Sequence, residues 1–148
     1  MSAADGGRVA SRLAELGLTL PEVAKPVAAY VPAVRSGDLV WSSGQLPFVD
    51  GKLTATGKVG AEVDPDDAQG LARICALNAL AAVGAEIGDL DRVRRVVKLV
   101  GYVASAPSFT GQPGVVNGAS QLIGDVFGEA GRHAGSRTAP RGHRCPAA

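Results

Sequence analysis

A long segment with helical periodicity, residues 64–88, constrains the fold of this chain more than any other feature. Its apolar residues recur at intervals of three and four, which is the pattern of one buried helix face. The first four residues, Asp-Pro-Asp-Asp, provide an N-cap, a proline at the first helical position and carboxylates that complement the helix dipole. Gly84 and Gly88 bracket the expected end of this helix.

A second segment of this kind begins at Pro113 and continues through Phe127. An amphipathic helix needs an apolar surface against which its stripe is buried. Two such helices in a chain that also carries strand-like runs predict an α+β layer fold, in which both helices cover one face of a sheet.

Three runs have the composition of strands. Residues 30–34 and 39–46 are apolar, and the Arg-Ser-Gly-Asp sequence at 35–38 suits the turn of a β-hairpin between them. Asp50-Gly51 marks a further turn. Residues 93–103 are rich in β-branched side chains and are predicted to form a central strand.

The composition fits one domain of 148 residues, of which 46% are hydrophobic. Lys and Arg total 15 against 14 Asp and Glu, so the chain lacks the charge excess with which proteins attract nucleic acids or anionic membranes. Its N-terminus lacks a signal-peptide core, and no run approaches the roughly 20 apolar residues that span a bilayer. We therefore expect a cytoplasmic protein with neither a membrane nor a nucleic-acid partner.

The cysteines and histidines do not predict a disulfide or a metal site. Cys75 lies within the first helical pattern and is expected to be a structural thiol. His133, His143 and Cys145 lack the spacing of zinc ligands. A metal site is therefore not expected.

Several motifs occur in the order in which the RidA/YjgF family has them. They are Tyr30, Ser43-Gly44-Gln45-Leu46-Pro47, the alanine-rich helix, the run at 93–103, and Val116-Asn117-Gly118-Ala119. On these motifs, residues 25–134 resemble the RidA/YjgF family of small trimeric enamine and imine deaminases. Residues 1–24 are then an N-terminal helical extension, in which Val9, Leu13 and Leu16 have helical spacing before Gly17.

The resemblance implies a chorismate-mutase-like fold, with a mixed sheet and two helices packed on one face. It also implies a homotrimer with ligand clefts between subunits, no cofactor, and hydrolysis of reactive 2-enamino and 2-imino acids such as 2-aminoacrylate. An imine carbon is already electrophilic. Such a site therefore needs only to orient the substrate carboxylate, place a water molecule and stabilise the developing charge.

The resemblance assigns five residues to ligand binding: Tyr30, Ser43, Gly44, Gln45 and Asn117. A tyrosine offers a small substrate one hydrogen bond and one apolar face, and a glycine permits close approach of the backbone. Each assignment also has an ordinary structural alternative. Tyr30 would be a core tyrosine with a satisfied hydroxyl, Ser43-Gly44-Gln45 a strand bend marked by glycine, and Asn117 a polar residue at a helix start.

The chain departs from the family at Gly135. Typical members have an arginine there that clamps the substrate carboxylate, followed by serine and two closing strands. The catalytic residue therefore remains unassigned and activity is expected to be impaired, since Arg132 and Arg137 do not reproduce that geometry by default. The family's acidic residue on the last strand has no counterpart.

The C-terminal strands are expected to be missing or altered. Residues 135–148 contain Pro and Gly in place of apolar alternation, and they are predicted to be a disordered tail. Because the resemblance stops abruptly, one hypothesis is that this tail is translated from a shifted reading frame, which sequencing of the coding DNA would test.

Three functions follow from these observations. The first is deamination of reactive enamines and imines, and the second is non-catalytic binding of small carboxylate metabolites by the same fold. The third, the ribonuclease or translation-inhibitor activity often attached to the family, conflicts with the neutral charge and the lack of an acid/base pair.

Overall fold

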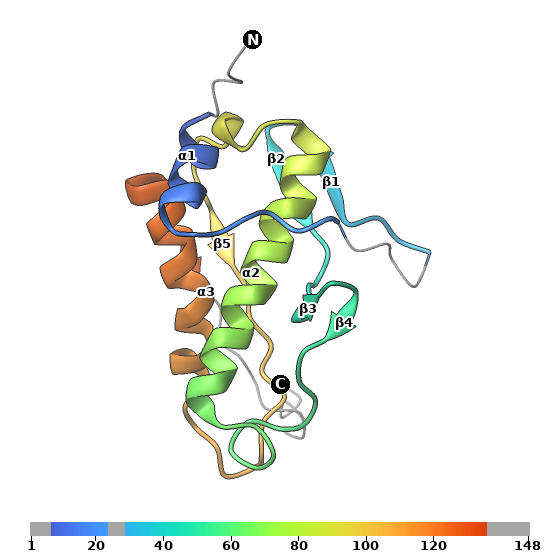
Figure 1. The fold of residues 1–148 in the computed structure, drawn as a ribbon, viewed down its shortest axis with the longest axis vertical. Helices are drawn as coiled ribbons and strands as arrows, with labels where there is room; N and C mark the ends of the chain where they lie inside the picture. The colour runs from blue at the N-terminus through green and yellow to red at the C-terminus, as the bar shows by residue number, and fades with distance from the viewer. Residues whose placement is uncertain (1–6, 24–28, 136–148) are drawn as a thin grey trace, which may run out of the picture.

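The structure is a computed structural model that describes residues 7–23 and 29–135. The elements follow the order α1 (Arg8–Glu15), β1 (Ala33–Ser36), β2 (Leu39–Ser42), β3 (Phe48–Val49), β4 (Lys52–Leu53), α2 (Pro65–Ile87), η1 (Leu90–Arg92), β5 (Lys98–Leu99), α3 (Gln112–Phe127), η2 (Gly128–Gly131) and β6 (Ala134–Gly135), where η denotes a 3₁₀ turn. Helices α2 and α3 run side by side (Figure 1), and strands β1, β2 and β3 contact α2.

Helix α2 begins and ends where its local sequence predicts. The Asp64 carboxylate accepts a hydrogen bond from the Asp66 backbone N–H at 2.9 Å, and Pro65 occupies the first turn. The helix ends at Gly88, whose φ of 84° is in the left-handed region that favours glycine. Gly84 stays inside the helix, where an added Cβ would make only ordinary van der Waals contact with Leu90.

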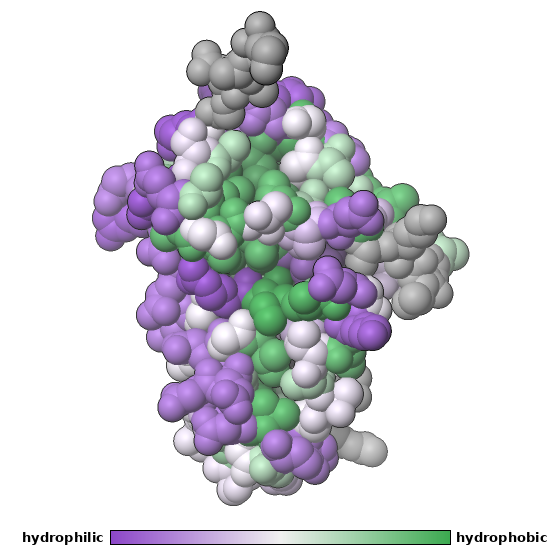
Figure 2. All heavy atoms as spheres, viewed as in Figure 1, coloured by the Kyte–Doolittle hydropathy of each residue, from purple (hydrophilic) through white to green (hydrophobic). Residues whose placement is uncertain are grey.

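Helix α2 is also the one described helix that is long and apolar enough to cross a membrane by length and composition, with a mean hydropathy of 1.4. It packs against α3 and against strands β1, β2 and β3. Figure 2 shows apolar residues in a band over α2 and polar residues over α3. The core helix of a soluble domain has the same length and composition, so this finding does not argue for a membrane span.

The main core lies between α1, α2 and α3. Its centre is Leu122, whose side chain is fully buried, and the other buried members are Val9, Leu13, Ala76, Leu80, Leu90, Ala119, Ile123, Val126 and Phe127. The predicted N-terminal helix is present as α1 and contributes two of these side chains. Its N-terminus is capped by the Asp91 carboxylate of η1, which accepts from the backbone N–H groups of Arg8 at 2.6 Å and Val9 at 2.7 Å.

Helices α2 and α3 approach closely at Gly118. A side chain there would overlap the Gln69 backbone carbonyl group, so α2 leaves no room for a Cβ. The Gln69 side-chain amide donates to the Gly114 carbonyl oxygen at 3.0 Å across the same interface. This contact fixes how near the two helices can lie.

The predicted hairpin is confirmed with shifted bounds. Strands β1 and β2 pair antiparallel through a turn at Gly37, whose φ is 58°. Tyr30 precedes the paired residues because Pro32 has no N–H to donate and regular pairing starts at Ala33. Strands β3 and β4 form a second hairpin whose turn contains Asp50-Gly51, as predicted.

The central strand predicted over residues 93–103 is wrong in its length. Only Lys98–Leu99 forms a strand, which pairs in parallel with Ala134–Gly135. A strand extends only where a neighbour supplies backbone partners. Here the Val96 N–H donates to the Ala130 carbonyl oxygen of η2 at 2.8 Å. This hydrogen bond lies outside the β5-β6 pair, so residue 96 is not part of the strand.

The predicted α+β class, with two helices packed together on one side, is confirmed. In the described residues the expected mixed sheet is divided into three two-stranded sheets, β1-β2, β3-β4 and β5-β6. Gly135, the first residue of the tail predicted to be disordered, lies in β6 and ends the described residues. The rest of that tail, residues 136–148, lies outside the described part, and so does the segment on which the shifted-frame hypothesis rests.

Candidate functional site

The Ser43-Gly44-Gln45 segment leaves the end of β2 in an ordered conformation. The Ser43 backbone N–H and hydroxyl both donate to the Pro32 carbonyl oxygen, at 2.8 and 3.1 Å. The Gln45 side-chain amide donates to the Ser43 carbonyl oxygen at 3.2 Å and to its hydroxyl oxygen at 3.3 Å. These hydrogen bonds hold the segment against the start of β1.

The middle of this segment is open. Gly44 is exposed, and a Cβ built on it would meet no heavy atom within 4 Å in the described part of the chain. The backbone N–H groups of Gly44 and Gln45 make no hydrogen bond with any described residue. These two neighbouring N–H groups can both donate to an anionic oxygen atom, and the lack of a side chain on Gly44 leaves room for that atom to approach.

Tyr30 lies at the same end of the hairpin, two residues before the proline that bonds Ser43. Its side chain is 53% exposed, so the alternative of a core tyrosine is wrong for the single chain. Trp41 and Leu46, also near this end, are exposed as well. The segment is therefore bordered by apolar side chains that nothing in the described chain covers.

Asn117 does not join this group within one chain. It lies exposed on α3, whereas β1 and β2 pack against α2. Its side-chain amide makes no hydrogen bond with a described residue. The structure thus brings together four of the five residues assigned to ligand binding and leaves the fifth apart.

An arginine that clamps the substrate carboxylate was expected at or near Gly135. Gly135 and Arg132, the two candidate positions in the described part, do not form such a clamp. Gly135 lies exposed in β6, and a Cβ on it would meet nothing within 4 Å in the described residues. Arg132 is exposed and forms an ion pair with Glu129 at 3.4 Å. Arg137 lies outside the described residues.

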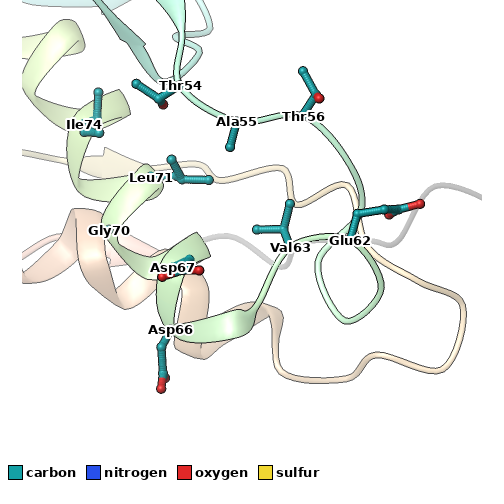
Figure 3. Close-up of a pocket in the computed structure, with 10 residues that line it drawn as sticks. All are labelled: Thr54, Ala55, Thr56, Glu62, Val63, Asp66, Asp67, Gly70, Leu71 and Ile74. Carbon is teal, nitrogen blue, oxygen red and sulfur yellow. The ribbon is translucent and has the colours of Figure 1, made fainter.

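A hollow of about 600 Å³ lies beside the N-terminal half of α2 and was not predicted from the sequence. Figure 3 shows Thr54, Ala55 and Thr56 across from Leu71 and Ile74 of α2. The carboxylates of Glu62, Asp66 and Asp67 lie at its rim, and the backbone N–H of Lys58 lowers the pKa of Glu62 by donating to it at 2.8 Å. This negative rim does not suit a carboxylate ligand.

No group of three or more His, Cys, Asp or Glu side chains in the described residues could hold a metal ion. Cys75 lies half-buried in α2, and burial raises the pKa of its thiol to about 11. Since the thiolate is the reactive form, this thiol is poorly suited to nucleophilic or metal chemistry.

We expect Cys75 to be alkylated slowly by iodoacetamide at pH 8, because its thiolate fraction is on the order of 100-fold below that of a free cysteine with a pKa of about 8.5. Mass spectrometry on a Cys145→Ser variant would measure the rate at this thiol alone. Unfolding in urea should bring the rate to that of glutathione. A native rate equal to that of glutathione would contradict the burial.

Comparison with known proteins assigns the chain to a family. It matches the family described as "YjgF/chorismate mutase-like, putative endoribonuclease" over residues 10–140. It is 50% identical to Protein TCP17 of Trypanosoma cruzi over 135 residues, which cover 90% of this chain and 84% of that protein.

Two solved structures are similar to this fold. The crystal structure of a protein of unknown function from Agrobacterium tumefaciens superposes with a TM-score of 0.80 at 50% identity, covering 88% of this chain and 80% of that one. A protein from Shewanella oneidensis MR-1, described in the same endoribonuclease terms, superposes with a TM-score of 0.84 at 36% identity, covering 86% and 84%. The chain therefore belongs to the YjgF/chorismate-mutase-like family.

Proposed function

We propose that this chain hydrolyses reactive 2-enamino and 2-imino acids such as 2-aminoacrylate, weakly as it stands, in clefts that form between the subunits of a homotrimer. The observation that carries the proposal is the Ser43-Gly44-Gln45 segment, which hydrogen bonds hold in place while the backbone N–H groups of Gly44 and Gln45 have no partner among the described residues. Rigid donors of this kind stabilise charge without reorganising during the reaction.

In this proposal the segment binds the substrate and orients it. The N–H groups of Gly44 and Gln45 would hold an oxygen of the substrate carboxylate, and the absence of a side chain on Gly44 would let the substrate approach the backbone. Tyr30 would supply a hydroxyl and an apolar surface. Water then adds to the imine carbon, the proton it loses goes to the departing nitrogen, and ammonia and a 2-keto acid are released.

The apolar surface beside this segment supports assembly. Val34 and Trp41 are directly opposite each other in the β1-β2 register, and both are exposed, Trp41 by 63%. In the residues that flank β5, Val97, Val100 and Tyr102 are also exposed, the last by 85%. Exposed apolar pairs on a sheet are typical of a subunit interface, because a water-facing surface of this kind is costly.

We expect Trp41→Lys to convert the trimer to a folded monomer, because the substitution places a charge in the proposed interface without removing a core contact. Light scattering after size exclusion would measure the mass. Trp41 is the single tryptophan, so its fluorescence in the unsubstituted chain should shift to longer wavelength as dilution dissociates the trimer. A monomeric mass for the unsubstituted chain at all concentrations would contradict the proposal.

We expect Gly44→Val to lower the rate of 2-aminoacrylate hydrolysis by about 10-fold or more while changing the free energy of unfolding by less than about 0.5 kcal/mol. The side chain would enter open space in the single chain but would fill the proposed cleft. The substrate can be released from serine by a dehydratase, and 2-keto acid formation above the spontaneous rate gives the activity.

Gly124→Ala is the matched control, since Gly124 is exposed on α3 and its Cβ would also meet nothing within 4 Å in the described residues. Equal activity of the two variants would exclude Gly44 from the site. If the unsubstituted chain binds small keto acids in a titration but gives no rate above background, the binding-module alternative holds instead.

Cleavage of RNA is the second candidate because the matching family and the Shewanella protein carry that description. The described residues offer one histidine for acid/base chemistry, His133, whose ring nitrogens lie within hydrogen-bonding distance of Ser120 and Gly131. RNA degradation by the purified protein that is lost with Tyr30→Phe would support this candidate over deamination.

A further inference from the structure

His133 is held in an orientation that determines its tautomer. Its Nδ1 lies 2.6 Å from the Gly131 carbonyl oxygen and its Nε2 lies 3.1 Å from the Ser120 hydroxyl oxygen. A carbonyl oxygen can only accept, so Nδ1 must carry the proton. In the neutral imidazole, Nε2 then presents its lone pair to Ser120, which donates its hydroxyl proton.

This is the arrangement in which a histidine acts as a general base on a serine. The nucleophile and the base are within hydrogen-bonding distance, and a third group orients the base. The third group here is a backbone carbonyl of η2, in place of a carboxylate.

The orienting backbone is itself anchored. The Ala134 N–H donates to the Val97 carbonyl oxygen at 3.0 Å, and the Ala130 carbonyl oxygen accepts from the Val96 N–H at 2.8 Å. These contacts hold η2 and β6 against the β5 segment on both sides of His133. The imidazole therefore rests on a fixed support, as a catalytic base requires.

A donor for developing negative charge lies beside Ser120. Asn117 precedes it by three residues on α3, and residues at this spacing are neighbours on one helix surface, with Cβ atoms about 5–6 Å apart. Asn117 is exposed, and its amide has no partner among the described residues. Ser120 and His133 are each partly exposed, and Gly135, two residues after His133, adds no side chain near them.

We propose that Ser120 is a nucleophile for small activated acyl esters, with His133 as its base and the Asn117 amide as the donor to the acyl oxygen. This site does not use the Ser43-Gly44-Gln45 segment. Of the five residues that the resemblance assigns to ligand binding it uses only Asn117, and it does not depend on the proposed deamination.

The reaction has two steps. The Ser120 oxygen bonds to the acyl carbon as its proton passes to Nε2 of His133 and the carbonyl electron pair moves onto oxygen near Asn117. That pair returns, the bond to the leaving oxygen breaks, and the leaving group takes the proton from Nε2. Water then attacks the acyl-serine by the same route, which releases the carboxylic acid and restores Ser120.

The test uses two probes on the full chain, a fluorophosphonate and p-nitrophenyl acetate. We expect the first to form one adduct on Ser120, with loss of fluoride, and the second to give a burst of p-nitrophenol. Ser120→Ala should abolish both signals. His133→Gln should slow adduct formation by about 100-fold or more, the usual contribution of a general base.

Ser36→Ala is the matched control, because Ser36 is an exposed serine on β1 and no histidine among the described residues is hydrogen-bonded to it. Its labelling should equal that of the unsubstituted chain. If His133→Gln does not fold, as judged by circular dichroism, the mapped adduct and the Ser120→Ala variant decide the result. Absence of an adduct on the folded chain, or labelling that survives Ser120→Ala, would overturn the proposal. A chain that deaminates 2-aminoacrylate but forms no adduct on Ser120 would contradict this proposal alone. A chain that forms the adduct but does not deaminate would contradict only the proposed function.

Discussion

A version of this chain in which strands typical of the family replace residues 135–148 will hydrolyse 2-aminoacrylate on the order of 10 to 100-fold faster than the chain as it stands. The rebuilt segment supplies the arginine that pairs with the substrate carboxylate. A charge-assisted hydrogen bond contributes roughly 1.5–3 kcal/mol, and about 1.4 kcal/mol corresponds to a factor of ten. The same assay that measures the Gly44→Val variant would measure this ratio.

Gly135→Arg alone should restore little of that activity. The position is exposed, and a Cβ there would meet nothing within 4 Å in the described residues, so no packing would hold the guanidinium in place. This variant is the control that separates the charge of the arginine from the structure that positions it.

Equal rates for the unmodified and rebuilt chains would show that another residue binds the carboxylate. Arg132 would first have to leave its ion pair with Glu129, so Glu129→Gln should then raise the rate. If Glu129→Gln has no effect, Arg137, which lies two residues after Gly135 in the sequence, is the next candidate to substitute.

Gly118→Ala is expected to lower the free energy of unfolding by about 1–3 kcal/mol, even though alanine is the better helix former. The added Cβ would overlap the Gln69 carbonyl group, which is backbone and cannot turn aside as a side chain could. Helices α2 and α3 would have to separate and lose packing around Leu122, the fully buried centre of the core. Urea unfolding followed by circular dichroism would measure the change.

Gly124→Ala in the same helix should have the opposite effect, a gain of about 0.5–1 kcal/mol, because its Cβ would enter open space. Both variants replace glycine by alanine in the same helix, so the gain in helix propensity is similar in the two. The difference between their free energies of unfolding therefore reports the overlap at Gly118. If both substitutions stabilise the protein, the helices do not approach as closely at Gly118 as the structure places them.

The local sequence determined the helices and their ends. The N-cap at Asp64, the left-handed glycine at Gly88 and the apolar stripe of α3 are each specified by residues a few positions apart, so a pattern in one chain is enough to read them. The β1-β2 turn and the ordered Ser43-Gly44-Gln45 segment are local for the same reason.

The tertiary structure decided the features that depend on distant partners. The sequence of residues 93–103 favours a strand throughout, but a strand needs backbone partners, and those in the described chain pair only Lys98–Leu99. Likewise, Asp91 caps a helix whose first residue, Arg8, lies 83 positions earlier. Ser120 of α3 meets His133, 13 residues later, because the chain turns back after η2. No local sequence pattern predicts such contacts. They form only when the helices and strands pack and bring hydrogen-bonding groups from separate segments together.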